Sequence, residues 1–322
     1  MIRLSGIHFL ATYNCNAACR HCFFDTKSDT AYMNPEIIDM VYADEHVAKH
    51  MFWNHISGGE LMLQHEKLYA LVSRIRRYFR GDVGISTNGY WATSPQIADT
   101  RLQELQDAGV NGISVSADIF HHEYISQEYV KNAVQSIVRA GFSRHSYVIG
   151  SFCNADVFNA TLYNKASEAY ISNIVAHSSI PVARPTIRSI GKGNSLNFPK
   201  RSTFSQQDKC TDLSECLGKR GLFNPAMVYV DVYGNVMICP GIIIGNLYVK
   251  GFSEIIENFT STQHILLEKL ATSPYSLYTH AVAMCGETLP KFFYDVCDMC
   301  YTSRLYVRSL YPEVLGPVEC YP

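Results

Sequence analysis

This chain has little charge, no long apolar segment and no secretion signal. No apolar run approaches the roughly eighteen residues that a membrane-spanning helix needs. The first residues, MIRLSGIHFLATYNC, lack an apolar stretch followed by a small-residue cleavage site, so we expect a cytoplasmic protein without a membrane segment. The 27 Lys and Arg nearly balance the 29 Asp and Glu, and this net charge of −2 argues against nucleic-acid binding. Internal repeats and low-complexity tracts are also missing.

The chain is rich in hydrophobic residues and in cysteines. Of its 322 residues, 47% are hydrophobic, enough for one large domain with a smaller appendage, and this excludes disorder as the main state. It has eleven cysteines. An odd number of cysteines in an unsecreted chain argues against a disulfide framework and favours metal binding or thiol chemistry.

Apolar strand patterns alternate with helical patterns through the first 190 residues. Six such units predict parallel strands with right-handed crossovers, as a doubly wound sheet or as part of a β/α barrel, and both folds gather chemistry at the carboxyl ends of the strands. The expected strands are Gly6–Ala11, Phe52–Ser57, Asp82–Thr87, Gly112–Ala117, His145–Phe152 and Ile180–Arg184. The expected helices are 35–50, 64–79, 95–108, 121–140 and 155–174.

The pattern changes after about residue 190. A Gly, Asn, Ser and Lys stretch leads to a predicted hairpin, Met227–Cys239, and then to a predicted helix near Ser253–Leu270. We therefore expect a first domain at 1–190, and a linker with a small α+β domain at 191–322.

Three cysteines follow the first predicted strand as a CxxxCxxC run, Cys15, Cys19 and Cys22. Three thiolates this close can hold one iron–sulfur cluster, and an iron without a protein ligand stays open to another chelator. The alternative is a zinc ion, which needs a fourth ligand such as His21 or a distant residue.

Polar and glycine-rich motifs stand at the ends of the next strands. Ser57-Gly58-Gly59-Glu60 follows the second, Ser86-Thr87-Asn88-Gly89 the third and Ser114-Val115-Ser116-Ala117-Asp118 the fourth. Taken singly, such residues also cap helices and form turns.

The ordered set of motifs resembles radical S-adenosylmethionine (SAM) enzymes, which have CxxxCxxC with an aromatic residue before the last cysteine, here His21. The resemblance implies a partial (β/α)6 barrel and a SAM-binding [4Fe–4S] cluster on Cys15, Cys19 and Cys22. It also implies these SAM contacts: Gly58, Gly59 and Glu60 to the amino group, Ser86, Asn88, Ser116 and Asp118 to the ribose and carboxylate, Val148-Ile149-Gly150 to the adenine, and Arg184 to the carboxylate.

A second set of cysteines lies beyond the first domain. Cys216, Gly234 and Cys239 give C-x17-G-x4-C, and Cys297 and Cys300 form a CxxC. This resembles the SPASM/twitch extensions of radical SAM enzymes, and it implies an auxiliary [4Fe–4S] cluster on Cys216, Cys239, Cys297 and Cys300. Cys210 is an alternative to Cys216, and structural zinc is an alternative to the cluster.

Two of the remaining cysteines, Cys285 and Cys153, are candidates for a thiol that returns hydrogen to a substrate radical. Inert burial is the alternative for each.

The resemblance implies an oxidoreductase or epimerase that cleaves SAM to a 5′-deoxyadenosyl radical and abstracts hydrogen from its substrate. Few residues precede Cys15, so we expect no leader-binding domain before it. We expect a ribosomal peptide to be epimerised or cross-linked, with a donor such as flavodoxin or ferredoxin supplying electrons. The alternatives are an epimerase or dehydrogenase of a sugar, aminocyclitol or other small molecule, and a non-catalytic iron–sulfur or zinc protein.

Overall fold

The structure is a computed structural model of the whole chain. It describes residues 4–26, 31–44, 50–142, 145–153, 160–176, 178–196, 203–208, 210, 222–286 and 289–322. Among these residues, no helix combines the length and the apolar character needed to cross a bilayer.

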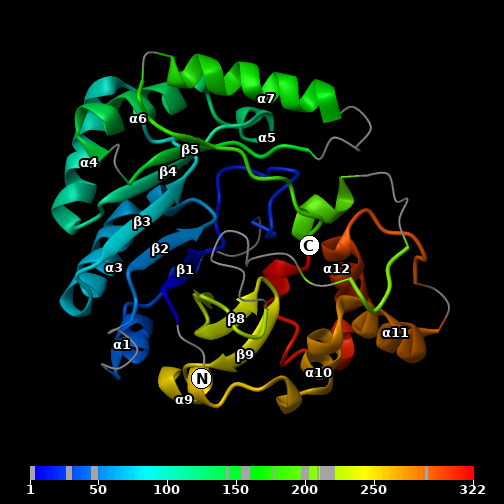
Figure 1. The fold of residues 1–322 in the computed structure, drawn as a ribbon. Coiled ribbons are helices and arrows are strands. Elements are labelled where there is room, and N and C mark those ends of the chain that lie inside the picture. Colours follow the sequence, from blue (N-terminus) through cyan, green and yellow to red (C-terminus); the bar gives the residue numbers. More distant parts are fainter. Residues whose placement is uncertain are drawn as a thin grey trace.

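A single nine-stranded sheet runs through the molecule in the order β6-β5-β4-β3-β2-β1-β7-β8-β9 (Figure 1). All pairs from β6 to β7 are parallel, and the pairs β7·β8 and β8·β9 are antiparallel. The six parallel strands expected from the sequence therefore exist in chain order, within a mixed α/β fold. The strands are β1 Gly6–Thr12, β2 Trp53–Gly58, β3 Asp82–Thr87, β4 Gly112–Ser116, β5 Tyr147–Ile149, β6 Val182–Ala183, β7 Met227–Asp231, β8 Asn235–Cys239 and β9 Ile242–Asn246.

Helices connect the parallel strands and cover the sheet, with α3, α4 and α6 together on its outer side (Figure 1). Helix α4 shows the local cause: Ser94 accepts a hydrogen bond from Ile97 N, Pro95 occupies the first turn, and Gly109 ends the helix at φ 108°. The helices of this part are α1 Glu36–Tyr42, η1 Leu61–Gln64, α3 His65–Tyr78, α4 Pro95–Ala108, α5 Ile119–His122, α6 Gln127–Arg139, α7 Ala160–Val175 and η3 Gly191–Ser195.

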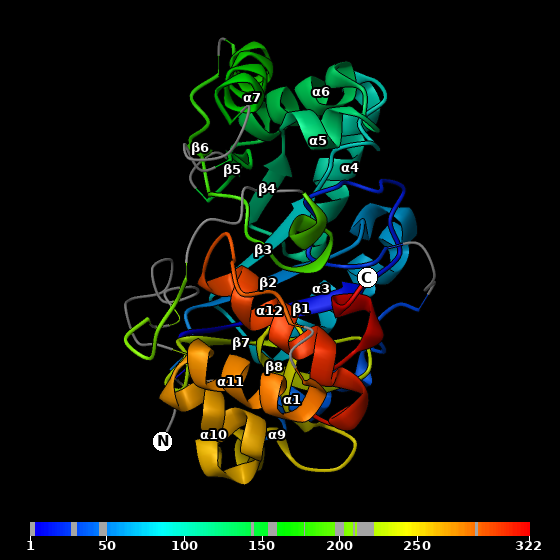
Figure 2. The ribbon, with the colours of Figure 1, turned by 90° about the vertical axis from the view of Figure 1, so that its right-hand side faces the viewer.

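The C-terminal part continues the sheet instead of forming one of its own. Strand β7 pairs with β1 from Gly6↔Met227 to Leu10↔Asp231, and the predicted hairpin follows as β7 and β8, turning at Gly234 with φ 76°. Helices α10 and α11 lie at the opposite end of the molecule from α6 and α7 (Figure 2). The helices here are α9 Phe252–Glu257, η4 Ser261–Gln263, α10 Ile265–Thr272, α11 Pro274–Cys285, α12 Val296–Val307, η5 Arg308–Leu310 and η6 Val318–Cys320.

Three predicted helices differ from the observed ones. The helix expected at 35–50 is α1, which ends at Tyr42. The segment expected as 121–140 is divided into α5 and α6, because Asp118 caps a first short helix and a second begins after Ser126. The helix expected near Ser253–Leu270 is likewise divided into α9 and α10, since the Thr260-Ser261-Thr262 segment favours turns over helix.

A buried carboxyl group closes the β7–β8 turn and predicts a pH-dependent stability. Asp231 is fully buried and accepts hydrogen bonds from Tyr233 N and Asn235 N, both at 2.9 Å. Burial raises its pKa to about 7. Between the unfolded value near 3.9 and about 7, the folded chain holds a proton that the unfolded chain lacks, so stability falls as pH rises through this window.

Asp231→Asn keeps an acceptor at this position and removes the ionisation. We expect the free energy of unfolding of the wild type to fall by about 1 to 3 kcal/mol from pH 5 to pH 8, and that of Asp231→Asn to fall by less. Urea unfolding at the two pH values measures the difference. Asp107→Asn on the exposed side of α4 is the control, and equal pH slopes for all three proteins would contradict the prediction.

Candidate active site

The first cysteine group lies in the loop that leaves the carboxyl end of β1. Cys15, Cys19 and Cys22 are free thiols in the structure. Ala17 N donates to Cys15 Sγ at 3.4 Å, and Cys22 N donates to the Cys19 carbonyl oxygen at 3.1 Å. Burial raises the pKa of all three thiols, that of Cys15 to about 12, so a metal that binds here must displace protons.

The two glycines at the end of β2, Gly58 and Gly59, pack against this cysteine loop. Gly59 N donates to the Thr12 carbonyl at 2.7 Å, and Glu60 N donates to the Asn14 carbonyl at 2.8 Å. A Cβ atom on Gly59 would lie 2.0 Å from the Asn14 carbonyl oxygen, and one on Gly58 would lie 2.1 Å from that of Thr12. Glycine is therefore required here for contact with the backbone of the cysteine loop, whereas the sequence suggested only an approach to ligand.

Glu60 joins the ends of β2 and β3. It is buried, and its carboxylate accepts hydrogen bonds from Met62 N at 3.0 Å, Thr87 Oγ1 at 2.9 Å and Asn88 N at 2.7 Å. Asn88 Nδ2 in turn donates to Asn16 Oδ1, inside the cysteine loop, at 2.9 Å. Three of about four acceptor positions of the carboxylate are thus used within the protein, and one is left for a ligand.

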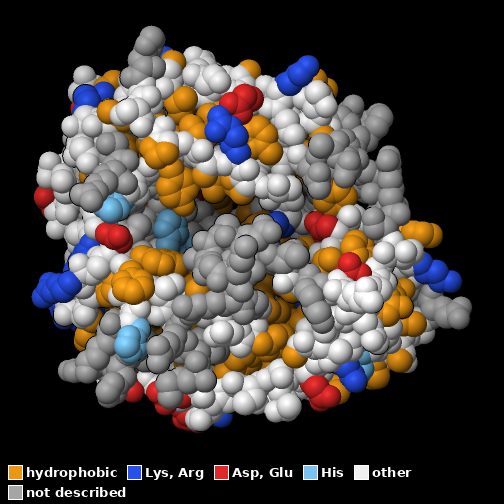
Figure 3. Space-filling model, in the orientation of Figure 1, with side chains coloured by type: hydrophobic (Ala, Val, Ile, Leu, Met, Phe, Trp, Pro, Cys, Tyr) orange, Lys and Arg blue, Asp and Glu red, His pale blue; other side chains and the backbone are white. Residues whose placement is uncertain are grey.

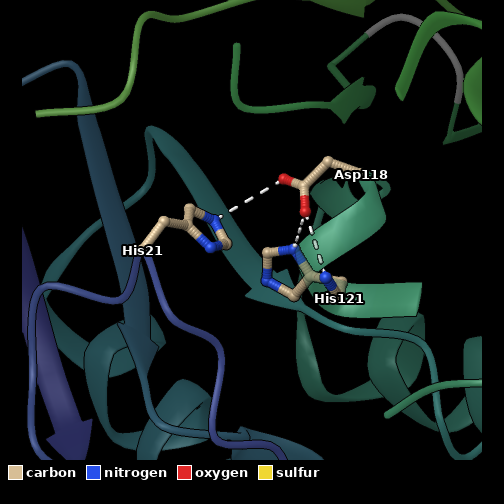
Figure 4. A group of neighbouring side chains, drawn as sticks. All are labelled: His21, Asp118 and His121. Carbon is tan, nitrogen blue, oxygen red and sulfur yellow. Dashed lines mark hydrogen bonds and ion pairs between the residues drawn. The ribbon is translucent and has the colours of Figure 1, made fainter. Parts of the chain in front are cut away.

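The end of β4 reaches the cysteine loop through Asp118, His121 and His21 (Figure 4). Asp118 Oδ1 accepts from His121 Nδ1 at 2.9 Å, and Asp118 Oδ2 lies 3.6 Å from His21 Nε2. Burial lowers the pKa of His21 to about 4. The Asp118 carboxylate raises the pKa of His121 despite burial, and His121 holds the pKa of Asp118 well below its usual range.

These three side chains are close enough to hold a metal ion, yet the carboxylate is already occupied. Asp118 also accepts hydrogen bonds from the backbone N–H groups of Phe120, His121 and Ser151, each at 3.0 Å. These bonds cap α5 and attach the end of β5 to that of β4, so this cluster serves to assemble the strand ends.

The remaining predicted SAM contacts are divided between the sheet and the surface. Ser86 lies on β3, where its hydroxyl bonds to His55 Nε2 at 2.7 Å, and Ser116 is half-buried at the end of β4. Arg184 lies elsewhere: both sides of its guanidinium pair with Glu168 of α7, at 2.9 and 2.6 Å, and the side chain is 46% exposed. The structure thus shows Arg184 in an ion pair at the surface, and its contact with the SAM carboxylate stays a prediction.

The structure separates the two candidate hydrogen donors. Cys153 is buried in one apolar cluster with Cys19 and Phe120, against which Cys15 and Cys22 also pack. Asn164 holds the Cys153 backbone through two hydrogen bonds of 2.8 Å, and burial raises the pKa of the thiol. Cys285 lies at the end of α11, where its thiol donates to the Tyr306 carbonyl at 3.5 Å. Only Cys153 is placed beside the first cysteine group.

A second group of cysteines lines one cavity. Its walls include Cys210, Cys239 from β8, and Cys297 and Cys300 from α12. Burial raises the pKa of these thiols, that of Cys239 to about 12. Cys216 lies outside the described residues, so the structure places Cys210 in this group and leaves the predicted role of Cys216 as a prediction.

The short helix η3 connects the two cysteine groups. Lys192 N donates to the Cys22 carbonyl at 2.8 Å, and Asn194 Nδ2 donates to Asp298 Oδ1 at 2.7 Å, between Cys297 and Cys300. Ile190, just before η3, lines the second cavity. Sequence reasoning treated this stretch as a linker, and no pattern in it signals these contacts.

Sequence reasoning also missed a polar layer on the sheet. His8 on β1 and His55 on β2 are half-buried neighbours with ring centroids 4.9 Å apart. His8 Nε2 bonds to Ser57 Oγ at 2.5 Å, and burial lowers the pKa of both imidazoles, that of His55 to about 4. Polar residues at alternate strand positions were the sequence signal that could have revealed this layer.

On one face of the molecule, a hollow is bordered by hydrophobic and histidine side chains (Figure 3).

Comparison with known proteins finds a family match over the part of the chain that holds the cysteine loop and the ends of β2, β3 and β4. Residues 9–152 match the model of the radical SAM superfamily. A solved structure of hexahistidine-tagged anSMEcpe with bound AdoMet superposes with a TM-score of 0.53 at 13% identity, covering 96% of this chain and 97% of that one. Streptococcus suis SuiB bound to precursor peptide SuiA gives a TM-score of 0.46 at 12% identity, covering 92% and 76%. No curated protein matches.

Proposed function

We propose that this chain, which carries a radical SAM domain at residues 9–152, cleaves SAM reductively and abstracts hydrogen from a ribosomal peptide. Cys15, Cys19 and Cys22 would hold the [4Fe–4S] cluster. When bound, cluster and SAM supply a 5′-deoxyadenosyl radical, and the protein holds the reactants in place and excludes water. Electrons would come from a donor such as flavodoxin or ferredoxin.

The observation that carries the proposal is the hydrogen-bonded assembly of strand ends around the cysteine loop. Gly59 and Glu60 bind the loop backbone, and Asn88 binds Asn16 within it. Asp118 reaches the same loop through His21. Motifs from β2, β3 and β4 thus meet at the three thiols, where SAM would contact Glu60 and Asn88, while Asp118 would hold the strand ends in place.

The family match favours an iron–sulfur cluster over zinc at the first cysteine group, because Cys15, Cys19 and Cys22 lie within the residues that match the radical SAM superfamily. Three cysteine ligands leave one iron of such a cluster open to SAM, whereas a structural zinc ion normally has four protein ligands.

The auxiliary site is proposed as a [4Fe–4S] cluster on Cys210, Cys239, Cys297 and Cys300. These four cysteines line one cavity. A buried nitrogen in its wall, Arg304 Nε, has no hydrogen-bond partner among the described residues, and it suits a sulfur acceptor. With four thiolates the cluster has no open iron, so it would transfer electrons and not bind substrate.

A peptide substrate is supported by the uncharged polar layer on the sheet. The depressed pKa values keep His8 and His55 neutral at pH 7, so the imidazoles and the hydroxyls of Ser57 and Ser86 offer donors and acceptors without charge. Such groups match peptide amides. A sugar or aminocyclitol would use the same groups and is the alternative outcome of the experiment below.

Within peptide modification, the position of Cys153 supports epimerisation. One hydrogen atom would leave a substrate C–H bond for the 5′-deoxyadenosyl group. The Cys153 S–H bond would then break and return one hydrogen atom to the opposite face of that carbon. The sulfur radical would recover its hydrogen from one electron of the external donor and one proton of solvent. The raised pKa keeps the S–H form that this step needs.

The test is anaerobic turnover of the full chain with SAM, dithionite and candidate peptides in D2O. We expect 5′-deoxyadenosine and one deuterium in the product, and we expect Cys153→Ala to form 5′-deoxyadenosine while losing the epimerised product. Cys285→Ala is the matched control. A product mass lower by two hydrogens would indicate cross-linking or dehydrogenation in place of epimerisation. Turnover with sugars but not with peptides would show that the substrate is a carbohydrate. A failure to cleave SAM would overturn the whole proposal.

A further inference from the structure

An arginine side chain lies in the wall of the second cysteine cavity. Arg304 follows Cys300 by four residues on α12, one helical turn further along the same face. Its side chain is 1% exposed, and it lines the cavity together with Cys210, Cys239 and Cys300. A fully buried guanidinium is rare because removing its charge from water is costly.

The groups that bind the Arg304 guanidinium by hydrogen bonds or ring contacts carry no formal charge. Arg304 Nη1 donates to the Pro240 carbonyl at 2.9 Å and to Tyr321 Oη at 3.3 Å. The guanidinium lies 5.3 Å from the ring centroid of Tyr301 and 5.6 Å from that of Tyr321. Within the described part of the chain, no carboxylate lies within 4.0 Å of it, and its Nε makes no hydrogen bond.

The groups that could balance the positive charge of Arg304 are the cysteine thiols of the same cavity, once they are ionised. Cys210, Cys239 and Cys300 line the same cavity as Arg304, and Cys300 precedes it by one helical turn. Two further charged residues, Arg188 and Asp295, lie near this group. Among these charged groups Arg304 is the fully buried one, so its charge is the least screened by water.

We propose that Arg304 is the counter-cation of the auxiliary cluster and raises its reduction potential; this inference rests on the proposed [4Fe–4S] cluster. Four thiolates around a [4Fe–4S] core carry a net negative charge, and one-electron reduction adds one more. A fixed positive charge beside the sulfurs stabilises the reduced form more than the oxidised form. Arg304 is thus a positioning and tuning residue, not a ligand.

The experiment isolates the auxiliary cluster in the full chain. A background with Cys15, Cys19 and Cys22 all changed to Ala removes the first cluster, so iron content and EPR signals report on the second. Arg304→Gln and Arg304→Lys are then compared by anaerobic redox titration. Arg308→Gln is the matched control, because Arg308 lies 5.2 Å from the same Tyr321 ring and is not part of the cavity wall.

We expect Arg304→Gln to lower the ratio of reduced to oxidised cluster at least tenfold at a fixed potential, a shift of about 59 mV for one electron. Arg304→Lys and Arg308→Gln should stay near the parent. An unchanged potential in Arg304→Gln overturns the inference, as does loss of iron in both Arg304 variants, which would indicate a purely structural role. A background protein without iron would show that the auxiliary cluster itself is wrong.

Discussion

Cys19→Ala is expected to abolish SAM cleavage and to reduce bound iron from about eight to about four per chain. Cys19 is a buried residue of the first loop, and its loss leaves two ligands for a cluster that needs three. We expect the rate of 5′-deoxyadenosine formation to fall at least a thousandfold. Iron and sulfide analysis after anaerobic reconstitution, with product assay by chromatography, measures both effects.

Cys285→Ala is the control for that loss. It also removes a cysteine thiol, but one that bonds to the Tyr306 carbonyl and lies outside both cysteine groups. It should keep about eight irons and the wild-type rate of SAM cleavage. Retention of cleavage by Cys19→Ala would remove the role assigned to this loop, and four irons in the wild type with zinc at the C-terminal thiols would remove the auxiliary cluster.

Gly59→Ala is expected to reduce SAM cleavage at least tenfold and to lower the iron bound by the first loop. The added methyl carbon would stand 2.0 Å from the Asn14 carbonyl oxygen and 3.0 Å from Cys15 N. Both atoms belong to the backbone and cannot rotate away, and Glu60 N also bonds to that carbonyl. The cysteine loop must therefore move, by an amount that misplaces Cys15.

The matched control for this substitution is Gly251→Ala. Gly251 precedes α9 at φ −61°, and a Cβ atom there would meet nothing within 4 Å. Its iron content and cleavage rate should equal those of the wild type. If Gly59→Ala and Gly251→Ala have the same iron content and cleavage rate, the close approach of Gly58-Gly59-Glu60 to the cysteine loop has no importance for the cluster.

The parallel strands could be predicted because each is a short apolar run with its own turn signals. The strand predicted at Asp82–Thr87 begins and ends at the same residues as β3, and the hairpin turn at Gly234 was also predictable. Helices α11 and α12 were not predicted, since their sequences have mixed polarity and are held by packing against each other. The curvature into a partial barrel, the domain boundary and the SPASM/twitch assignment stay predictions.

At the site, sequence motifs identified groups that meet in space but not what each one contacts. The segments after β2 and β3, Gly58-Gly59-Glu60 and Ser86-Thr87-Asn88-Gly89, both reach the cysteine loop, as their positions at strand ends implied. Glu60 is largely engaged by backbone N–H groups and Thr87, and Arg184 is paired with Glu168. Such partners depend on the three-dimensional neighbourhood, which single-sequence spacing does not contain. For the same reason, spacing could not choose between Cys210 and Cys216.

The position of β1 in the middle of the sheet has a consequence for synthesis on the ribosome. Its partner β7 follows some 221 residues later, the separation of the Ser5–Ala226 hydrogen bond. At about 5 to 20 residues per second, that interval lasts roughly 10 to 40 s. During it the β1 edge has no partner on that side, and the Cys15 loop at its end is not yet enclosed by η3. The nascent chain must therefore avoid aggregation at this edge until β7 has been made.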